Sequence, residues 1–267
     1  MVMADLGAAD AGPYSVVAAP VLKLPQRLDA DDRLAVEEPL EIRIGGRPVA
    51  VTMRTPGHDE ELAIGFCLSE GIDAREARIP DDLAANVVDV DAGGFDPARI
   101  QRNFYTSSSC GVCGKGALEA VAVDAPRVDS ELRIPAELVT ELPDRLRAAQ
   151  PAFAQTGGLH ATALFDAEGA VLCVREDVGR HNAMDKVIGW AHSARMLPLS
   201  DDILCVSGRL SFELVQKAAV AGCPILAAVG APSSLAVELA IDRRITLCGF
   251  VRGATLNVYS EPWRIDR

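Results

Sequence analysis

The fold is decided by residues 203–252, ILCVSGRLSFELVQKAAVAGCPILAAVGAPSSLAVELAIDRRITLCGFVR. Short apolar runs, typical of buried strands, alternate here with longer segments in which apolar side chains recur at helical spacing. We expect strands at ILCVSG, PILAAVG and TLCGFVRG, and helices at FELVQKAAVAG and SSLAVELAIDR. Such alternation predicts an α/β domain whose sheet is largely parallel and covered by helices.

The segments on either side extend this domain. Upstream, PAELVTELPDRLRAAQ predicts a helix, and HATALFD and AVLCVRE predict a β-hairpin that turns at Glu168-Gly169. HNAMDKVIGWAHSARM predicts a further helix before residue 203, and LNVYS a last strand. We therefore expect an α/β domain over residues 106–267.

The first part of the chain has a different pattern. LEIRI and PVAVTMR flank Gly45-Gly46, which predicts a hairpin, and HDEELAIGFCLSEGI predicts a helix that stops at Gly71. The first dozen residues, which are small and acidic, predict a loose tail. We expect a small α+β domain over residues 14–105.

Composition and charge exclude several functions. The formal net charge of −12 argues against a general affinity for nucleic acid or anionic lipid. The N-terminus lacks the features of a signal peptide, and the longest apolar stretch is too short to span a bilayer. Seven scattered cysteines do not form a disulfide framework. These features predict a cytoplasmic protein with reduced thiols.

The segment TSSSCGVCGKG carries the clearest chemistry. Its thiols, Cys110 and Cys113, are two residues apart and can therefore reach the same sulfur atom or metal ion. Nearby hydroxyls and Lys115 favour the thiolate form, a nucleophile that can attack a persulfide. Cys110 and Cys113 are the predicted catalytic residues. The other cysteines lie in apolar segments and are expected in the core: Cys67, Cys173, Cys205, Cys223 and Cys248.

Three other interpretations of the thiol pair stay open. A single CxxC is common in structural zinc sites and in redox disulfides, but the chain has no second CxxC or HxxxH to complete a zinc site. A zinc deaminase combines HxE with a downstream PCxxC, and His58 and Glu60 match the first motif. Ser109 replaces the proline, and the separation is long, so His58 and Glu60 more plausibly begin a helix. We expect no structural metal.

Polar and glycine-rich loops follow the predicted strands. Loops at strand ends form the usual ligand crevice of an open α/β sheet, where backbone amides bind anions. Helix capping is the alternative for Ser211, Ser233 and Ser234, as is a structural hydrogen bond for His160 or His181. Together the loops predict a site for a nucleotide-sized anion. Its expected residues are Arg180, His181, Lys186, Ser207, Gly208 and Arg209, with the late segment FVRGAT.

The motifs SCGVCG, TGGLHATALF, EDVGRHNAMDKVIG, SGRLSFELVQK, APSSLAVELA and TLCGFVRGATLNVY occur in this order. As a set they resemble the FdhD family of formate dehydrogenase accessory sulfurtransferases. TPGHDEELAIGFCLSEGI extends the resemblance upstream, so that it covers nearly all of the chain after about residue 15.

The resemblance implies a specific activity. A member receives sulfur from a cysteine desulfurase as a persulfide, on the cysteine that matches Cys110. It passes that sulfur to the molybdenum cofactor, bis-molybdopterin guanine dinucleotide, before the cofactor enters formate dehydrogenase. The segment that matches the cofactor-binding one consists of Phe250, Val251, Arg252, Gly253, Ala254 and Thr255. GDP is expected to act as an analogue of the cofactor.

The resemblance also implies a fold and an assembly. The main domain should be a three-layer α/β domain like that of cytidine deaminase, without zinc chemistry, and the protein should be a homodimer. Two functions remain in view: a sulfurtransferase with a covalent persulfide, and a non-catalytic chaperone that binds the molybdenum cofactor while the cysteines are incidental.

Overall fold

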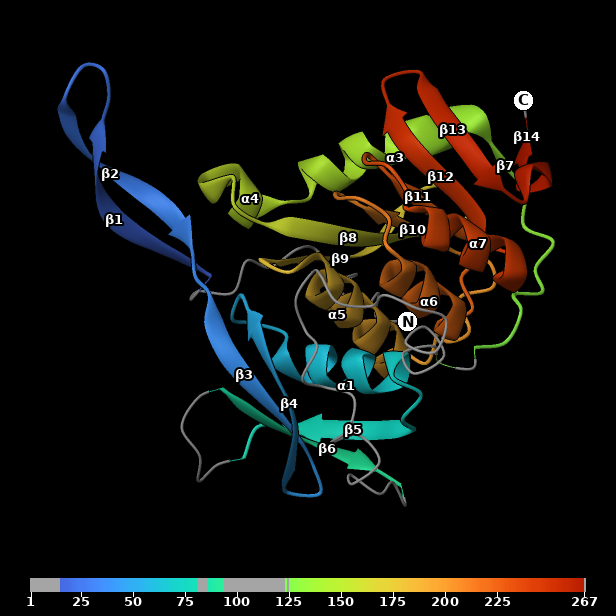
Figure 1. Cartoon of the computed structure of the whole chain (residues 1–267), viewed down its shortest axis with the longest axis horizontal. Coiled ribbons are helices and arrows are strands. Elements are labelled where there is room, and N and C mark those ends of the chain that lie inside the picture. The colour runs from blue at the N-terminus through green and yellow to red at the C-terminus, as the bar shows by residue number, and fades with distance from the viewer. Residues whose placement is uncertain (1–14, 81–85, 94–122, 124, 267) are drawn as a thin grey trace, which may run out of the picture.

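The centre of the protein is a six-stranded sheet with the strand order β13-β12-β11-β10-β8-β9. The computed structural model describes residues 15–80, 86–93, 123 and 125–266 (Figure 1). The strands of the sheet are β8 (His160–Phe165), β9 (Val171–Asp177), β10 (Ile203–Val206), β11 (Ile225–Ala228), β12 (Thr246–Arg252) and β13 (Thr255–Ser260).

The sheet is mixed, so the expectation of a largely parallel sheet was wrong. Only the pairs β10–β11 and β11–β12 of this sheet are parallel, whereas β8, β9 and β13 run antiparallel to their neighbours. Short turns join β8 to β9 and β12 to β13, and a short turn can join only antiparallel strands. The helix α5 (Arg180–Ser193) then connects β9 to β10, which runs in the same direction as β9 and is therefore antiparallel to β8 between them. The predicted hairpin of β8 and β9 is confirmed, and Gly169 in its turn has a φ of 78°.

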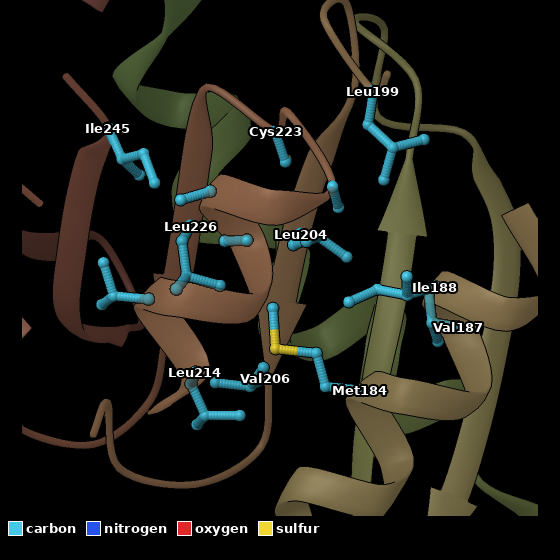
Figure 2. Packing of buried hydrophobic residues seen from close by; sticks show 14 of the residues in the cluster. Met184, Val187, Ile188, Leu199, Leu204, Val206, Leu214, Cys223, Leu226 and Ile245 are labelled. Atoms are coloured by element: carbon cyan, nitrogen blue, oxygen red, sulfur yellow. The ribbon is translucent and has the colours of Figure 1, made fainter. Parts of the chain in front are cut away.

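Helices cover both faces of this sheet, which gives three layers. One face carries α5 (Arg180–Ser193), α6 (Phe212–Val220) and α7 (Ser234–Arg243), and the other carries α3 (Ala136–Ala148). The short α4 (Pro151–Thr156) follows α3. Figure 2 shows Met184 of α5 and Leu214 of α6 packed over Leu204 and Leu226 of the sheet. The predicted three-layer α/β domain is confirmed.

In the small domain, the described residues form a four-stranded sheet, β4-β3-β6-β5, and the helix α1. Its elements are β3 (Glu38–Ile44), β4 (Arg47–Arg54), α1 (Asp59–Ser69), β5 (Ala74–Arg78) and β6 (Val87–Ala92). The hairpin predicted at Gly45-Gly46 is confirmed, with φ values of 56° and 78°. The predicted helix is also confirmed: His58 directly precedes α1, and Gly71, which follows it, has a φ of 74°.

The two sheets are joined through α1 and α5, which lie side by side (Figure 1). A buried ion pair lies at this joint: Lys186 Nζ is 2.7 Å from Asp177 Oδ2, and the two side chains are 1% and 0% exposed. The same ammonium donates to Thr55 O, and the backbone N of Thr55 donates to the same carboxylate. The predicted domain border at residue 105 lies outside the described residues.

A two-stranded arm, β1 (Val16–Lys23) and β2 (Leu28–Ala35), projects from the body (Figure 1, blue). The sequence predicted no particular strand within residues 16–35. At the other end of the chain, β14 (Ile265–Asp266) pairs with β7 (Ile134–Pro135), next to a 3-10 turn at Pro262–Arg264. No helix of the described residues has both the length and the apolar character needed to cross a membrane.

Candidate ligand-binding site

The ends of β10, β11 and β12 and the start of β8 meet at one edge of the large sheet. The loops there touch through their backbones, because Gly230 N donates to Gly208 O (3.1 Å) and Phe250 N donates to Gly230 O (3.1 Å). A Cβ atom on Gly230 would lie 2.7 Å from Gly208 O, so this approach requires glycine. The predicted convergence of the loops on one edge is confirmed.

A cavity of about 510 Å³ lies between this edge and the helices α3 and α4. Its volume is in the range of sites for drug-sized ligands and cofactors. The sheet edge contributes Gly157, Gly158, His160, Ser207, Val251, Arg252 and Gly253 among others. The helices contribute Thr140, Asp144, Arg147 and Phe153 among others. Four of the predicted binding residues, Ser207, Val251, Arg252 and Gly253, therefore line one cavity.

The sheet side of the cavity offers neutral hydrogen-bonding groups. The backbone N of Ala161 donates to Ser207 Oγ (2.9 Å), which leaves the hydroxyl proton of Ser207 free to donate to a ligand. Burial, followed by the charges of Arg180 and His181, lowers the pKa of His160. His160 is therefore a neutral imidazole near pH 7, able to donate or accept a hydrogen bond without adding charge.

The segment FVRGAT contributes a cation and an unusual backbone. Arg252 is exposed at the cavity, with its guanidinium 5.8 Å from the ring centroid of Phe250. Phe250 has a φ of 53°, a left-handed conformation that is costly for a bulky side chain and is found most often at functional sites. Gly253 has a φ of 55°, with open space where a Cβ would stand. Thr255 closes the turn by donating to Arg252 O.

Arg180 and His181 lie on the other side of the same edge, at the start of α5. His181 Nε2 is 2.9 Å from Glu213 Oε2 and 3.1 Å from Ser211 Oγ. The hydrogen bond with His181 is the main cause of the lowered pKa of Glu213. Arg180 Nε is buried and has no hydrogen-bond partner among the described residues. These side chains can reach a ligand that extends across the edge, but they do not line the cavity.

Two predicted residues lie elsewhere. Lys186 is buried in the joint between the sheets, where its ammonium contacts Asp177, Thr55 and Glu176. Its donors are therefore already used, and the structure places it outside the cavity. Arg209 is exposed in the loop between β10 and α6 and does not line the cavity either.

Sequence reasoning missed the helical wall of the cavity. Thr140, Asp144 and Arg147 share one face of α3, and the guanidinium of Arg147 lies 3.7 Å from the centroid of the Phe153 ring. Their spacing was visible in the sequence as a polar helical face. Nothing in the sequence places α3 over the strand ends, because that position depends on packing between distant segments.

Helix capping, the alternative role of Ser211, Ser233 and Ser234, is observed for the side chain of Ser233. Ser233 is the N-cap of α7 and accepts a hydrogen bond from Ala236 N (3.2 Å). Ser211 is the N-cap residue of α6, but its side chain contacts His181 instead of a backbone amide of the helix. Ser234 is the first residue of α7.

Cys110 and Cys113 lie outside the described residues. The other five cysteines are free thiols buried in the three hydrophobic clusters of the protein, as predicted. Burial raises the pKa of the Cys67, Cys173, Cys223 and Cys248 thiols to about 12, and it raises the pKa of Cys205 as well. None of these five thiols is available as a nucleophile near neutral pH.

The deaminase interpretation finds no support in the described part of the chain. His58 and Glu60 lie at the start of α1 in the small domain, and His58 Nδ1 is 3.5 Å from Glu61 Oε2. No three His, Cys, Asp or Glu side chains of the described residues gather in a way that could hold a metal ion.

The fold and the site define a class: three-layer α/β proteins with a glycine-rich ligand cavity at the strand ends and a CxxC pair in the sequence. The chain belongs to the FdhD/NarQ family, whose model matches residues 35–266. It is 53% identical over 251 residues to the "Sulfur carrier protein FdhD" of Streptomyces avermitilis, covering 88% of this chain and 89% of the relative. The protein of that name from Mycobacterium tuberculosis is 51% identical over 264 residues, covering 91% and 95%.

A solved structure supports the same assignment. A crystal structure described as a formate dehydrogenase accessory protein from Desulfotalea psychrophila matches with a TM-score of 0.74 and 26% identity. The match covers 94% of this chain and 98% of the other. The predicted family and the predicted fold class are therefore both confirmed.

Proposed function

We propose that this chain is a sulfurtransferase that carries sulfur for the maturation of formate dehydrogenase, with the sulfur held as a persulfide on Cys110. The relatives named as sulfur carriers and the accessory protein of Desulfotalea psychrophila support this role. The burial of the other five thiols carries the assignment to the CxxC pair, because it leaves Cys110 and Cys113 as the two candidates for the reactive sulfur.

The proposed loading step is an exchange between sulfurs. The thiolate of Cys110 attacks the terminal sulfur of a persulfide on a cysteine desulfurase. The sulfur–sulfur bond of the donor breaks, the donor leaves as a thiolate, and Cys110 becomes the persulfide. No net oxidation occurs, so this step needs no other reactant.

The proposed release step uses the second thiol. The thiolate of Cys113 attacks the inner sulfur of the Cys110 persulfide, which forms a Cys110–Cys113 disulfide and expels hydrosulfide. The two electrons gained by the departing sulfur come from the pair of cysteines. A cellular thiol reductant then restores the pair.

The proposed acceptor is the molybdenum cofactor in its bis-molybdopterin guanine dinucleotide form, which is cargo and not a resident group. The cavity supports this choice, since Arg252, Ser207 and the glycines of the edge are suited to a diphosphate. At about 510 Å³ it can take one guanosine diphosphate arm of so large a molecule. Arg180 and His181, at the start of α5, are the proposed contacts for the part that extends across the edge.

The proposed setting is the cytoplasm, with formate dehydrogenase as the recipient and a second copy of this chain as a partner. The arm supports a dimer. Val17, Leu28 and Leu34 are 50%, 60% and 48% exposed and share one face of a ribbon that has two strands within the described residues. Residues 16–35 carry three basic and three acidic side chains, so two arms can meet without the repulsion expected between chains of net charge −12.

The non-catalytic chaperone is the alternative, and mass measurement separates the two. Full-length protein is incubated with a cysteine desulfurase and cysteine, and its intact mass is then recorded. In Cys113→Ala, which cannot carry out the proposed release step, the carrier function predicts a gain of one sulfur atom that dithiothreitol removes. Cys110→Ala should abolish the gain, whereas Cys113→Ala should load sulfur but not release it.

The matched control is the ability to activate formate dehydrogenase in cells that lack the native gene. Cys110→Ala should give no activity while the protein accumulates to the normal level. Full dehydrogenase activity with Cys110→Ala, or no sulfur gain by Cys113→Ala, would favour the chaperone and overturn the carrier function.

A further inference from the structure

The cavity contains one unexpected charge. Asp144 is the one carboxylate among the described residues that line it, and it projects from the exposed face of α3. Its side chain has no hydrogen bond or ion pair within the described part of the chain. The other charged side chains of the lining are the cations Arg147 and Arg252.

A carboxylate at this place opposes the binding of a phosphate-bearing ligand. It lies in a concave site, where charges interact more strongly than they do in open water, and it belongs to a chain that is already at −12. The repulsion is reversed only if the ligand presents hydrogen-bond donors to Asp144. Guanine has such donors on one edge, N1–H and the 2-amino group, spaced to pair with both oxygens of a carboxylate. Adenine presents a lone pair at N1 instead, which a carboxylate repels.

The residue one turn further along α3 supplies a surface for the flat base. The guanidinium of Arg147 stacks on Phe153 at 3.7 Å, which holds its plane in place. Stacked guanidinium and aromatic groups bind nucleobases of any kind, so they contribute affinity without choosing the base. Asp144 would therefore select the base, and Arg147 would stack on it.

We propose that Asp144 is the specificity-determining residue of the cavity and selects guanine by accepting hydrogen bonds from N1–H and the 2-amino group. The guanidinium of Arg147, supported by Phe153, stacks against the base, and the diphosphate extends toward Arg252 at the sheet edge. This inference rests on the proposed binding of a guanine dinucleotide.

The test is calorimetric titration of the full-length protein with GDP, IDP and ADP. Because IDP lacks the 2-amino group, it should bind more weakly than GDP and more tightly than ADP. A hydrogen bond to a charged group is worth roughly 10- to 100-fold in affinity, so Asp144→Asn should weaken GDP by about that factor. The same variant should bind ADP as well as the wild type does, or better, because the repulsion is gone.

Glu137→Gln is the matched control, since it removes a carboxylate from an exposed position of the same helix that does not line the cavity. It should leave all three affinities unchanged. If the wild type binds no guanine nucleotide, the proposed cofactor binding itself is wrong. If the wild type prefers GDP and Asp144→Asn keeps that preference in full, the proposed function stands and the assignment to Asp144 is overturned.

Discussion

Two glycines allow α1 and α5 to cross in near contact. A Cβ on Gly65 would come within 2.6 Å of the carbonyl carbon of Asp185, and one on Gly189 equally close to that of Glu61. Each glycine therefore faces the backbone of the other helix. The contact is reciprocal. Near it, Glu61 of α1 forms an ion pair with Arg175 of β9, in which Arg175 Nε lies 2.6 Å from Glu61 Oε2.

Gly189→Ala should destabilise the protein although alanine is the better helix former. Helix propensity alone would favour alanine by about 1 kcal/mol. The clash with a backbone that cannot move aside should cost more, and we expect a net loss of about 1–3 kcal/mol in the free energy of unfolding. Urea denaturation followed by circular dichroism measures it.

Gly158→Ala is the control for Gly189→Ala. A Cβ there meets nothing closer than 3.7 Å, and the backbone is not left-handed. We expect its free energy of unfolding to stay within about 0.5 kcal/mol of the wild type. An unchanged midpoint for Gly189→Ala as well would show that the two helices can separate without cost.

For single residues, the sequence predicted which side chains are buried better than it predicted which side chains bind the ligand. The five core cysteines were predicted correctly, because a thiol within an apolar strand or helix has few other places to go. Lys186 was assigned to the ligand because it follows a strand in a polar loop. Its pairing with Asp177 depends on the approach of Thr55 from the small domain, which local sequence does not contain.

The start of β10 carries a carboxylate whose titration affects stability. Burial raises the pKa of Asp202 to about 6, and the negative charges of Asp201 and Asp166 add to the effect. The folded state therefore binds this proton more tightly than the unfolded chain does. The side chain makes no unfavourable contribution below about pH 4, and it destabilises the fold progressively as the pH rises through 6.

Asp202→Asn should consequently stabilise the protein at pH 7.5 and have a smaller effect at pH 4.5. Because the side chain is half exposed, solvent screening limits the expected gain to at most about 1 kcal/mol. Thermal unfolding at both pH values measures the difference. Asp73→Asn, the same change at an exposed position of the small domain that does not contribute to the raised pKa of Asp202, serves as the control. An equal shift at the two pH values for Asp202→Asn would contradict the assigned pKa.

Elements with strong local patterns were predicted, and those with weak patterns were not. The segments that form β10, α6, β11 and α7 each have an apolar run or apolar residues at helical spacing, and glycine or proline lies near their ends. The arm has neither: β1 contains alanines and a proline, and β2 reads LDADDRLA, which is poor in the β-branched and aromatic residues of strands. The position of α3 over the strand ends, and with it half of the cavity, depends on tertiary packing alone.

At the scale of the whole molecule, the arm should control assembly. Val17→Asp places a charge on its apolar face, and we expect this to convert a dimer into a monomer at micromolar concentration, because an unpaired charge buried in an interface costs several kcal/mol. Sedimentation velocity measures the mass. Ala18→Asp adds the same charge on the opposite face, beside Arg33, and should leave the dimer intact. A wild type that is monomeric, or a dimeric Val17→Asp, would contradict this role of the arm.

The depth at which the five core thiols lie also decides where sulfur can travel. A thiol with a pKa of about 12 is ionised at pH 7 in only about one molecule in 100,000, and exchange with a persulfide requires the ionised form. Sulfur bound to one cysteine of the chain would therefore not scramble onto these five within the time of a transfer. A thiol-labelling reagent applied to the native protein should modify two cysteines, and it should modify seven only after unfolding.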